Sequence, residues 1–389
     1  MAGTYFLSLG LITILVTVAQ LGLDLPVMRM IAVSHSDGDS PRVRAIARTG
    51  LLLTGWMALL LSIGALLAAP SVSRLFDDPL LSDVFRIMAI AIVPYTTVMI
   101  LGRAFASVGR PVAGEFSQRL GFQTLFVSLL LLLPALVGNV ALAYAFTLAY
   151  WFVLAIVWWQ WISTIPKPPS LPRLAPKALL RPAAPLLAAA SMYLLVEWSD
   201  ILIIGYFLGP EDVGVYGAAL RVSGAIAVVL AVATSIAGPR FASLHEADST
   251  TELSSYTRQV VRLCGLAALP FFGLMISAPQ WIMGLFGSEF EVGASVLVIL
   301  AAGQMVNAAT GPMGVLLVMS GRESDVFRAT AVAAVTNTVL NLILIPSLGI
   351  EGAAIATAIS LVVVNGIVIR FVAKRLGIRI LGTRSDASS

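Results

Sequence analysis

The sequence predicts an all-α, polytopic membrane protein built from two repeated helical lobes. Its composition is 59% hydrophobic and only 11% charged, with a mean hydropathy of +0.96. Soluble domains carry about 25% charged residues. Long apolar runs recur along the whole chain, and the two halves share residues at a constant separation. These three observations leave no room for a sizeable soluble domain.

The apolar runs have the length of membrane-spanning helices. A span needs about 20 apolar residues, and backbone groups in lipid must be satisfied within the segment, which a helix does. The short alternating segments of a transmembrane barrel are not visible. We therefore predict eleven spans, at residues 4–27, 47–69, 83–107, 117–136, 140–164, 184–208, 213–236, 260–285, 293–319, 328–346 and 351–373.

Basic residues predict the orientation. Of the 24 lysines and arginines, all but Arg74, Arg86 and Arg221 fall in alternate loops or in the C-terminal tail. Cytoplasmic loops carry such an excess of positive charge. This pattern places the C-terminus in the cytoplasm and the N-terminus outside. It also assigns the net charge of +4 to membrane orientation and not to a nucleic-acid partner.

A proline-rich segment divides the chain. Residues 165–182 contain six prolines and four basic residues, which indicates a semi-rigid, extended cytoplasmic linker. The predicted domains are an N-lobe of five spans (1–164), this linker, a C-lobe of six spans (183–374) and a cytoplasmic tail (375–389).

The lobes are interpreted as repeats. Internal duplication is typical of transporters, whose substrate sites lie between the repeats. The predicted span 184–208 has no counterpart in the N-lobe, so the chain is expected to start one helix late. Residues 4–164 are expected to superpose on 213–374. The matched pairs include Gly3 with Gly214, Tyr5 with Tyr216, Arg29 with Arg240 and Gly109-Arg110 with Gly321-Arg322.

Three charged residues lie inside predicted spans, around the turn at 208–212. They are Glu197, Asp200 and Arg221. A charge at membrane depth is costly and marks a candidate functional site. Asp200 and Arg221 lie at similar depth on adjacent antiparallel helices, so they could form an ion pair that locks the helices, or they could line a cavity. Glu197 and Asp200 share a helix face, which suits cation or proton coupling or simply forms a polar face.

Amides form a second candidate group. Gln304 and Asn307 share a face of one span, and Gly311-Pro312 is expected to break that span and free backbone carbonyls. This group could line a cavity or hydrogen-bond between helices. Asn337 and Asn341 are interpreted as interhelical hydrogen-bonding residues.

Enzyme motifs are missing from the sequence. It contains no G-x-x-x-x-G-K-[ST] phosphate loop, no H-E-x-x-H, no C-x-x-C and no G-x-S-x-G. Its single cysteine and two histidines give no metal-binding pattern. We predict a transporter without catalytic residues, cofactor or metal.

Several segments of the C-terminal half resemble polysaccharide-biosynthesis flippases, the O-antigen and exopolysaccharide members of the multidrug/oligosaccharidyl-lipid/polysaccharide exporter superfamily. They are GVYGAALR (214–221), LFGSEFEVGASVLVILAAGQ (285–304), SGR (320–322) and IPSLGIEGAAIATAIS (345–360). The resemblance implies two six-helix lobes around a central cavity. It also implies transport of polyprenyl-pyrophosphate-linked oligosaccharide across the inner membrane, for lipopolysaccharide or exopolysaccharide synthesis.

This resemblance gives the candidate residues a role. An anionic head group crossing hydrocarbon needs a polar, cationic path, and Arg221 is the basic residue deepest in a predicted span. Two other functions stay open: a cation-coupled multidrug antiporter of the same superfamily, and a truncated, inactive member that acts as a scaffold in a polysaccharide polymerase complex.

Overall fold

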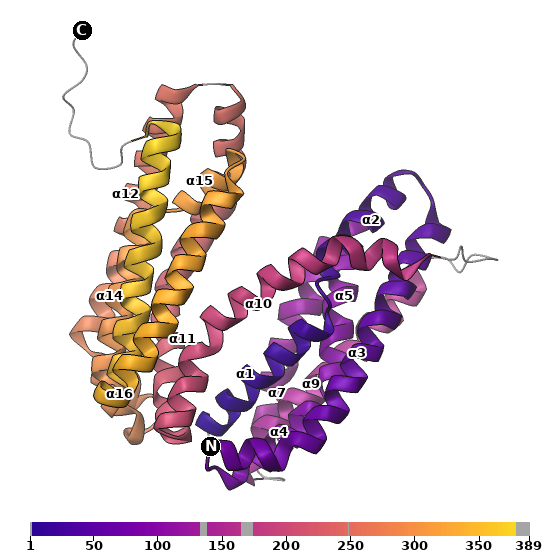
Figure 1. The fold of residues 1–389 in the computed structure, drawn as a ribbon, viewed down its shortest axis with the longest axis horizontal. Helices are drawn as coiled ribbons and strands as arrows, with labels where there is room; N and C mark the ends of the chain where they lie inside the picture. The colour runs from indigo at the N-terminus through magenta and orange to yellow at the C-terminus, as the bar shows by residue number, and fades with distance from the viewer. Residues whose placement is uncertain (1, 133–137, 165–173, 248, 379–389) are drawn as a thin grey trace. The chain divides into compact units, whose positions relative to one another are not determined.

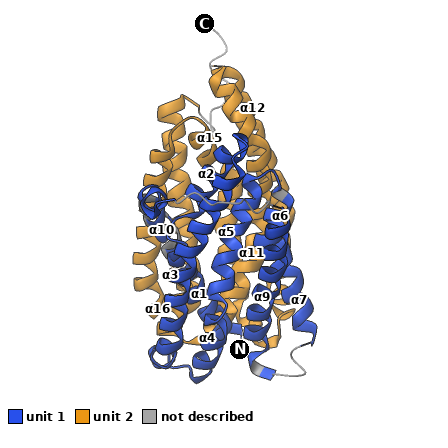
Figure 2. Ribbon diagram, turned by 90° about the vertical axis from the view of Figure 1, so that its right-hand side faces the viewer, with its two compact units in different colours: residues 1–198 blue, residues 199–389 orange. Residues whose placement is uncertain are grey.

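The computed structural model describes residues 2–132, 138–164, 174–247 and 249–378, and all regular structure in these ranges is helical. The predicted all-α fold is confirmed. The chain forms two compact units, Met1–Trp198 (unit 1) and Ser199–Ser389 (unit 2), which Figure 2 colours separately. The division lies inside a helix, beyond the linker that the sequence suggested as the boundary.

Unit 1 is a bundle in which α3 packs against α4 and α5, while α9 packs against α5 and α7 (Figure 1). Its buried centre includes an aromatic stack in which the rings of Tyr95 and Tyr150 lie 4.1 Å apart and those of Phe122 and Tyr150 lie 4.3 Å apart. The elements are α1 (Ala2–Ala19), α2 (Asp24–Ser36), α3 (Ser40–Leu75), α4 (Pro79–Ala89), α5 (Ile92–Ser107), α6 (Pro111–Glu115), the π-helical segment η1 (Phe116–Leu120), α7 (Gly121–Leu132), η2 (Gly138–Val140), α9 (Ala141–Thr164) and most of α10 (Pro176–Phe207).

In unit 2, helix α14 packs against α11, α12 and α16, all of which are labelled in Figure 1. The longest helix, α16, contains one non-helical residue, Gly349, with φ of 62°. This break lies between two of the predicted spans, 328–346 and 351–373, which α16 therefore contains one after the other. The elements are the end of α10, then α11 (Pro210–Glu246), α12 (Thr250–Ser277), α13 (Pro279–Gly284), η3 (Ser288–Gly293), α14 (Ala294–Thr310), α15 (Met313–Met319) and α16 (Glu323–Leu376).

The described residues hold seven helices that are long and apolar enough to cross a membrane, or eight if α4 and α5 count as one span. This makes the chain a multi-pass membrane protein. The sequence suggested eleven spans. Helix α16 contains two of the predicted spans within one helix. The predicted spans 117–136 and 184–208, which correspond to α7 and α10, are not among these helices.

The predicted first span, 4–27, is wrong as a continuous helix. Helix α1 ends at Ala19, and α2 begins at Asp24. Leu21 and Gly22 have left-handed φ angles of 54° and 67°. A Cβ atom on Gly22 would lie 2.5 Å from the Ala183 carbonyl oxygen, so the close approach of α10 requires glycine there.

Other predicted spans are also broken. Helices α4 and α5 meet at a bend of 45° within the span 83–107. The break at Gly311-Pro312 is confirmed: α14 ends at Thr310, Gly311 has φ of 70°, and α15 starts at Met313. The span 260–285 is divided between α12 and α13 at Ala278.

The linker is helical over its last third. Residues 165–173 lie outside the described part, but α10 begins at Pro176, so residues 176–182 are not extended as predicted. Leu179 and Ala183, one helical turn apart, are fully buried in the core of unit 1. Their burial favours the helix, and proline is tolerated in its first turn.

Both units repeat one local feature of the predicted duplication. Gly109 in unit 1 and Gly321 in unit 2 have φ angles of 76° and 69°, and each precedes an arginine at a loop before a helix. The superposition of the lobes stays a prediction.

Candidate functional site

A buried carboxylate organises the polar centre of unit 2. Asp200, near the end of α10, is only 4% exposed. Its Oδ2 accepts hydrogen bonds from the Tyr216 hydroxyl at 2.6 Å and from the Thr357 hydroxyl at 2.5 Å. Its Oδ1 accepts one from Nδ2 of Asn341 at 2.5 Å. Three helices, α10, α11 and α16, therefore meet at this one side chain.

Further polar residues extend this group. The Ser199 hydroxyl and Nδ2 of Asn341 each donate to Oδ1 of Asn337 at 3.1 Å. Nδ2 of Asn337 donates to the Thr357 hydroxyl at 3.4 Å. The prediction that the two asparagines hydrogen-bond between helices is confirmed. We call the set the Asp200 cluster: Ser199, Asp200, Tyr216, Asn337, Asn341 and Thr357.

The partners of the Asp200 carboxylate are neutral donors, and Arg221, which the sequence suggested as its partner, is not among them. The Arg221 side chain is exposed, and its Nη1 donates to the Gly217 carbonyl on its own helix at 3.4 Å. Tyr216, which reaches Asp200, lies five residues earlier, about 140° away around a helix of 3.6 residues per turn. The predicted Asp200–Arg221 pair is therefore wrong. The two residues were matched by their depth along the helices, and depth alone does not say which face of its helix each residue occupies.

Glu197 and Asp200 lie in different surroundings. Glu197 is exposed, whereas Asp200 is buried among its donors. The two residues are three apart on α10, but Asp200 alone of the two belongs to the cluster. The two carboxylates of the predicted pair therefore differ, since one is exposed and the other is buried.

The amide group forms a second chain of hydrogen bonds in unit 2. Nδ2 of Asn307 donates to Oε1 of Gln304 at 3.5 Å, which confirms that they share a face of α14. Oδ1 of Asn307 accepts from Nδ2 of Asn365 at 3.0 Å, and Oδ1 of Asn365 accepts from the Thr310 hydroxyl at 2.8 Å. This chain connects α14 to α16 beside the break at Gly311.

An apolar groove runs between α11 and α12. Its volume is about 570 Å³, and its α11 wall runs from Ala225 to Ala237, opposite residues from Tyr256 to Phe271 on α12. Arg221 lies four residues before Ala225 and seven before Val228, so it shares their helix face. A guanidinium thus precedes an apolar groove along one stripe of α11.

The Asp200 cluster offers oxygen atoms to a small cation. Oδ1 of Asn341 is buried without a hydrogen-bond partner in the described part of the chain. Carboxylate, hydroxyl and amide oxygens are ligands that hard cations prefer. Within the described residues, no group of three His, Cys, Asp or Glu side chains comes together as a transition-metal site does. One carboxylate among neutral groups suits a proton or a monovalent cation.

Tyr216, Thr357, Ser199 and Asn365 were not singled out from the sequence as site residues. Thr357 is separated from Asp200 by 157 residues, and no local spacing indicates such a contact. Tyr216 offered a signal, since it follows the turn after Asp200 and its hydroxyl needs a partner when the ring is buried.

Known proteins resemble this chain in sequence and in fold. A probable low-salt glycan biosynthesis flippase of Haloferax volcanii, Agl15, is 34% identical over 169 residues, which are 43% of this chain and 36% of that protein. The chain therefore matches little more than a third of the relative's length.

Two solved structures share the fold. An inward-facing multidrug resistance MATE family transporter of the MOP superfamily has a TM-score of 0.75 at 16% identity, covering 96% of this chain and 91% of its own. The lipid II flippase MurJ, in an inward closed conformation, has a TM-score of 0.63 at 10% identity, covering 95% and 86%. These likenesses concern the fold alone.

The family model for polysaccharide biosynthesis proteins matches residues 4–295, which include all of unit 1 except its first three residues, and the first part of unit 2. The match includes Asp200, Tyr216 and Arg221, together with both walls of the apolar groove. By this match the chain belongs to the polysaccharide biosynthesis protein family.

Proposed function

We propose that the protein flips a polyprenyl-pyrophosphate-linked oligosaccharide from the cytoplasmic to the outer leaflet, for the synthesis of a cell-surface polysaccharide such as lipopolysaccharide or exopolysaccharide. The observation that carries the proposal is the stripe of α11 on which exposed Arg221 precedes an apolar groove. The family and the Haloferax volcanii relative support it.

The two chemistries of this stripe match the two parts of such a substrate. A guanidinium donates bidentate hydrogen bonds to phosphate oxygens and stays charged at every physiological pH. The groove offers apolar side chains to a polyprenyl tail, whose transfer out of water is favourable. In this proposal Gln304 and Asn307 supply hydrogen bonds to the sugars, and no catalytic step takes place.

The Asp200 cluster supplies the coupling site of the proposal. A proton or monovalent cation at Asp200 would change the charge at the point where α10, α11 and α16 meet. The neutral donors around the carboxylate would then rearrange. Glu197, exposed one turn earlier on α10, is a position from which a cation could approach.

The test is a flipping assay with purified protein in lipid vesicles. A fluorescent polyprenyl-pyrophosphate oligosaccharide is placed in the outer leaflet, and its protection from a membrane-impermeant quencher is followed. We expect protection to rise faster than in empty vesicles. Export of a cationic drug in the same vesicles without lipid protection would assign the antiporter function, and neither activity would favour the scaffold role in a polymerase complex.

The proposed location is the inner membrane with a cytoplasmic C-terminus. A reporter fused beside Lys177 is expected to report the cytoplasm, and one beside Glu211 the external side, because basic loops stay inside. Paired alkaline phosphatase and fluorescent-protein fusions measure this. The opposite pattern at both positions would reject the topology.

A further inference from the structure

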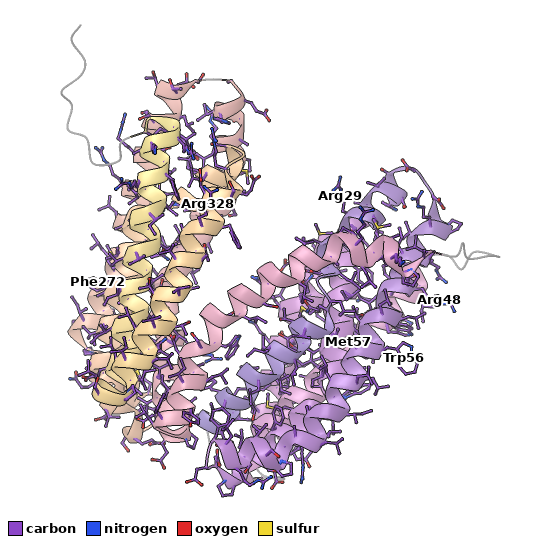
Figure 3. The ribbon with its side chains drawn as sticks, viewed as in Figure 1. Arg29, Arg48, Trp56, Met57, Phe272 and Arg328 are labelled. Carbon is purple, nitrogen blue, oxygen red and sulfur yellow. The ribbon has the colours of Figure 1, made fainter. Side chains whose placement is uncertain are left out.

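A second concave site lies in unit 1, apart from the residues used above. It has a volume of about 240 Å³ and lies along α2, beside the start of α3 and the first part of α10. Its lining residues are Pro26, Arg29, Met30, Val33, Ser34, Arg42 and Pro182. We call it the basic pocket. Figure 3 labels Arg29, which projects from α2.

The pocket carries two positive charges and no acidic lining residue. Arg29 and Arg42 are exposed, and the ion pairs found in the described part of the chain involve Asp325 with Arg328 and Arg375 instead. The nearby Asp39 carboxylate accepts the backbone N–H of Arg42 at 3.0 Å, as the cap of α3. Two guanidiniums facing one hollow repel each other, so the pocket favours an anion between them.

The rest of the lining selects the kind of anion. Ser34, which is 3% exposed, adds a hydroxyl, while Met30 and Val33 add apolar surface beside the charges. Arginine side chains recognise phosphate by paired hydrogen bonds. Basic pockets between transmembrane helices on the cytoplasmic side bind phospholipid head groups. The loop charges predict that this end of unit 1 faces the cytoplasm.

We propose that the basic pocket binds the phosphate head group of an anionic membrane lipid. The glycerol and the first part of the acyl chains would contact Met30 and Val33. Because Arg29 and Arg42 belong to unit 1 and Arg221 to unit 2, this lipid site does not depend on the flippase proposal.

The experiment is a lipid titration of the purified protein in detergent, followed by native mass spectrometry. We expect phosphatidylglycerol to bind more tightly than phosphatidylcholine. Arg29→Ala and Arg42→Ala should each weaken phosphatidylglycerol binding roughly tenfold, the effect of losing a charge-assisted hydrogen bond. Arg48→Ala, which removes an exposed arginine of α3 that does not line the pocket, should leave binding unchanged. Arg29 and Arg48 are both labelled in Figure 3.

Three outcomes would overturn the proposal. They are equal binding of the two lipids, equal losses in the Arg48 variant, and displacement of the lipid by inorganic phosphate at the same concentration, which would assign the pocket to free phosphate. Thermal unfolding measurements check that each variant is folded. If an alanine variant is produced in low yield, Arg29→Gln or Arg42→Gln is used in its place.

Discussion

Arg221→Ala is expected to reduce glycan export by roughly ten- to a hundredfold while the protein remains in the membrane at nearly normal levels. The side chain is exposed, and surface substitutions usually change stability little. What is lost is the guanidinium that the proposal assigns to the pyrophosphate. Charge-assisted hydrogen bonds contribute about 1.5–3 kcal/mol each, which corresponds to a loss of roughly ten- to a hundredfold in transport.

Complementation of an export-deficient strain, with membrane abundance measured by immunoblot, tests this result. Arg221→Lys should restore part of the export, because the charge remains but the planar fork does not. Arg240→Ala removes another exposed arginine of α11 and serves as the matched control. If the Arg240 variant were as inactive as the Arg221 variant, or if Arg221→Ala exported normally, Arg221 would have no specific role.

Asp200→Ala is expected to lower the stability of the protein as well as its transport. Three hydrogen bonds, from Tyr216, Thr357 and Asn341, would be lost at a buried site. Removing one partner of a buried hydrogen bond costs about 1–3 kcal/mol. We expect a loss of roughly 3–5 kcal/mol in the free energy of unfolding, because the three effects are not fully additive. Asp200→Asn should lose less, since its amide oxygen keeps one acceptor.

Thermal unfolding in detergent measures the effect, and Glu197→Ala is the control. Glu197 lies three residues earlier on α10 but is exposed, so its removal should change stability by about 0.5 kcal/mol or less. The double variant Asp200→Ala/Arg221→Ala should stay inactive and no more stable than Asp200→Ala. Recovery of export in the double variant would instead support an ion pair between Asp200 and Arg221, and it would contradict the role proposed for Arg221.

The sequence predicts the helices well because apolar length is a local property. Helix α9 (Ala141–Thr164) nearly coincides with the predicted span 140–164. The break at Gly311-Pro312 was also foreseen, since glycine and proline act through their own backbone. By contrast, the break after Ala19 depends on the close approach of Gly22 to Ala183 on α10, a contact between distant segments that has no local signal.

The polar site was predicted in part. Charges in apolar spans drew attention to Asp200, and spacing on α16 to Asn337 and Asn341. The hydrogen bond between Asn341 and Asp200 was not predicted, because the two residues lie 141 positions apart in the sequence. The Asp200–Arg221 pairing was wrong because residue depth is readable from a hairpin, whereas the rotation of each helix is set by packing.

The distances between Asp200 and its donors along the chain have a consequence for synthesis. Tyr216 follows Asp200 by 16 residues, but Asn341 and Thr357 follow by 141 and 157. At about 5–20 residues per second, the ribosome needs roughly seven to thirty seconds to deliver the last two donors. Until then, Tyr216 is the one of these three donors that has been synthesised and can hydrogen-bond to the carboxylate in the bilayer. We therefore expect α10 and α11 to leave the translocon together as a hairpin, with Asp200 held near water until α16 arrives.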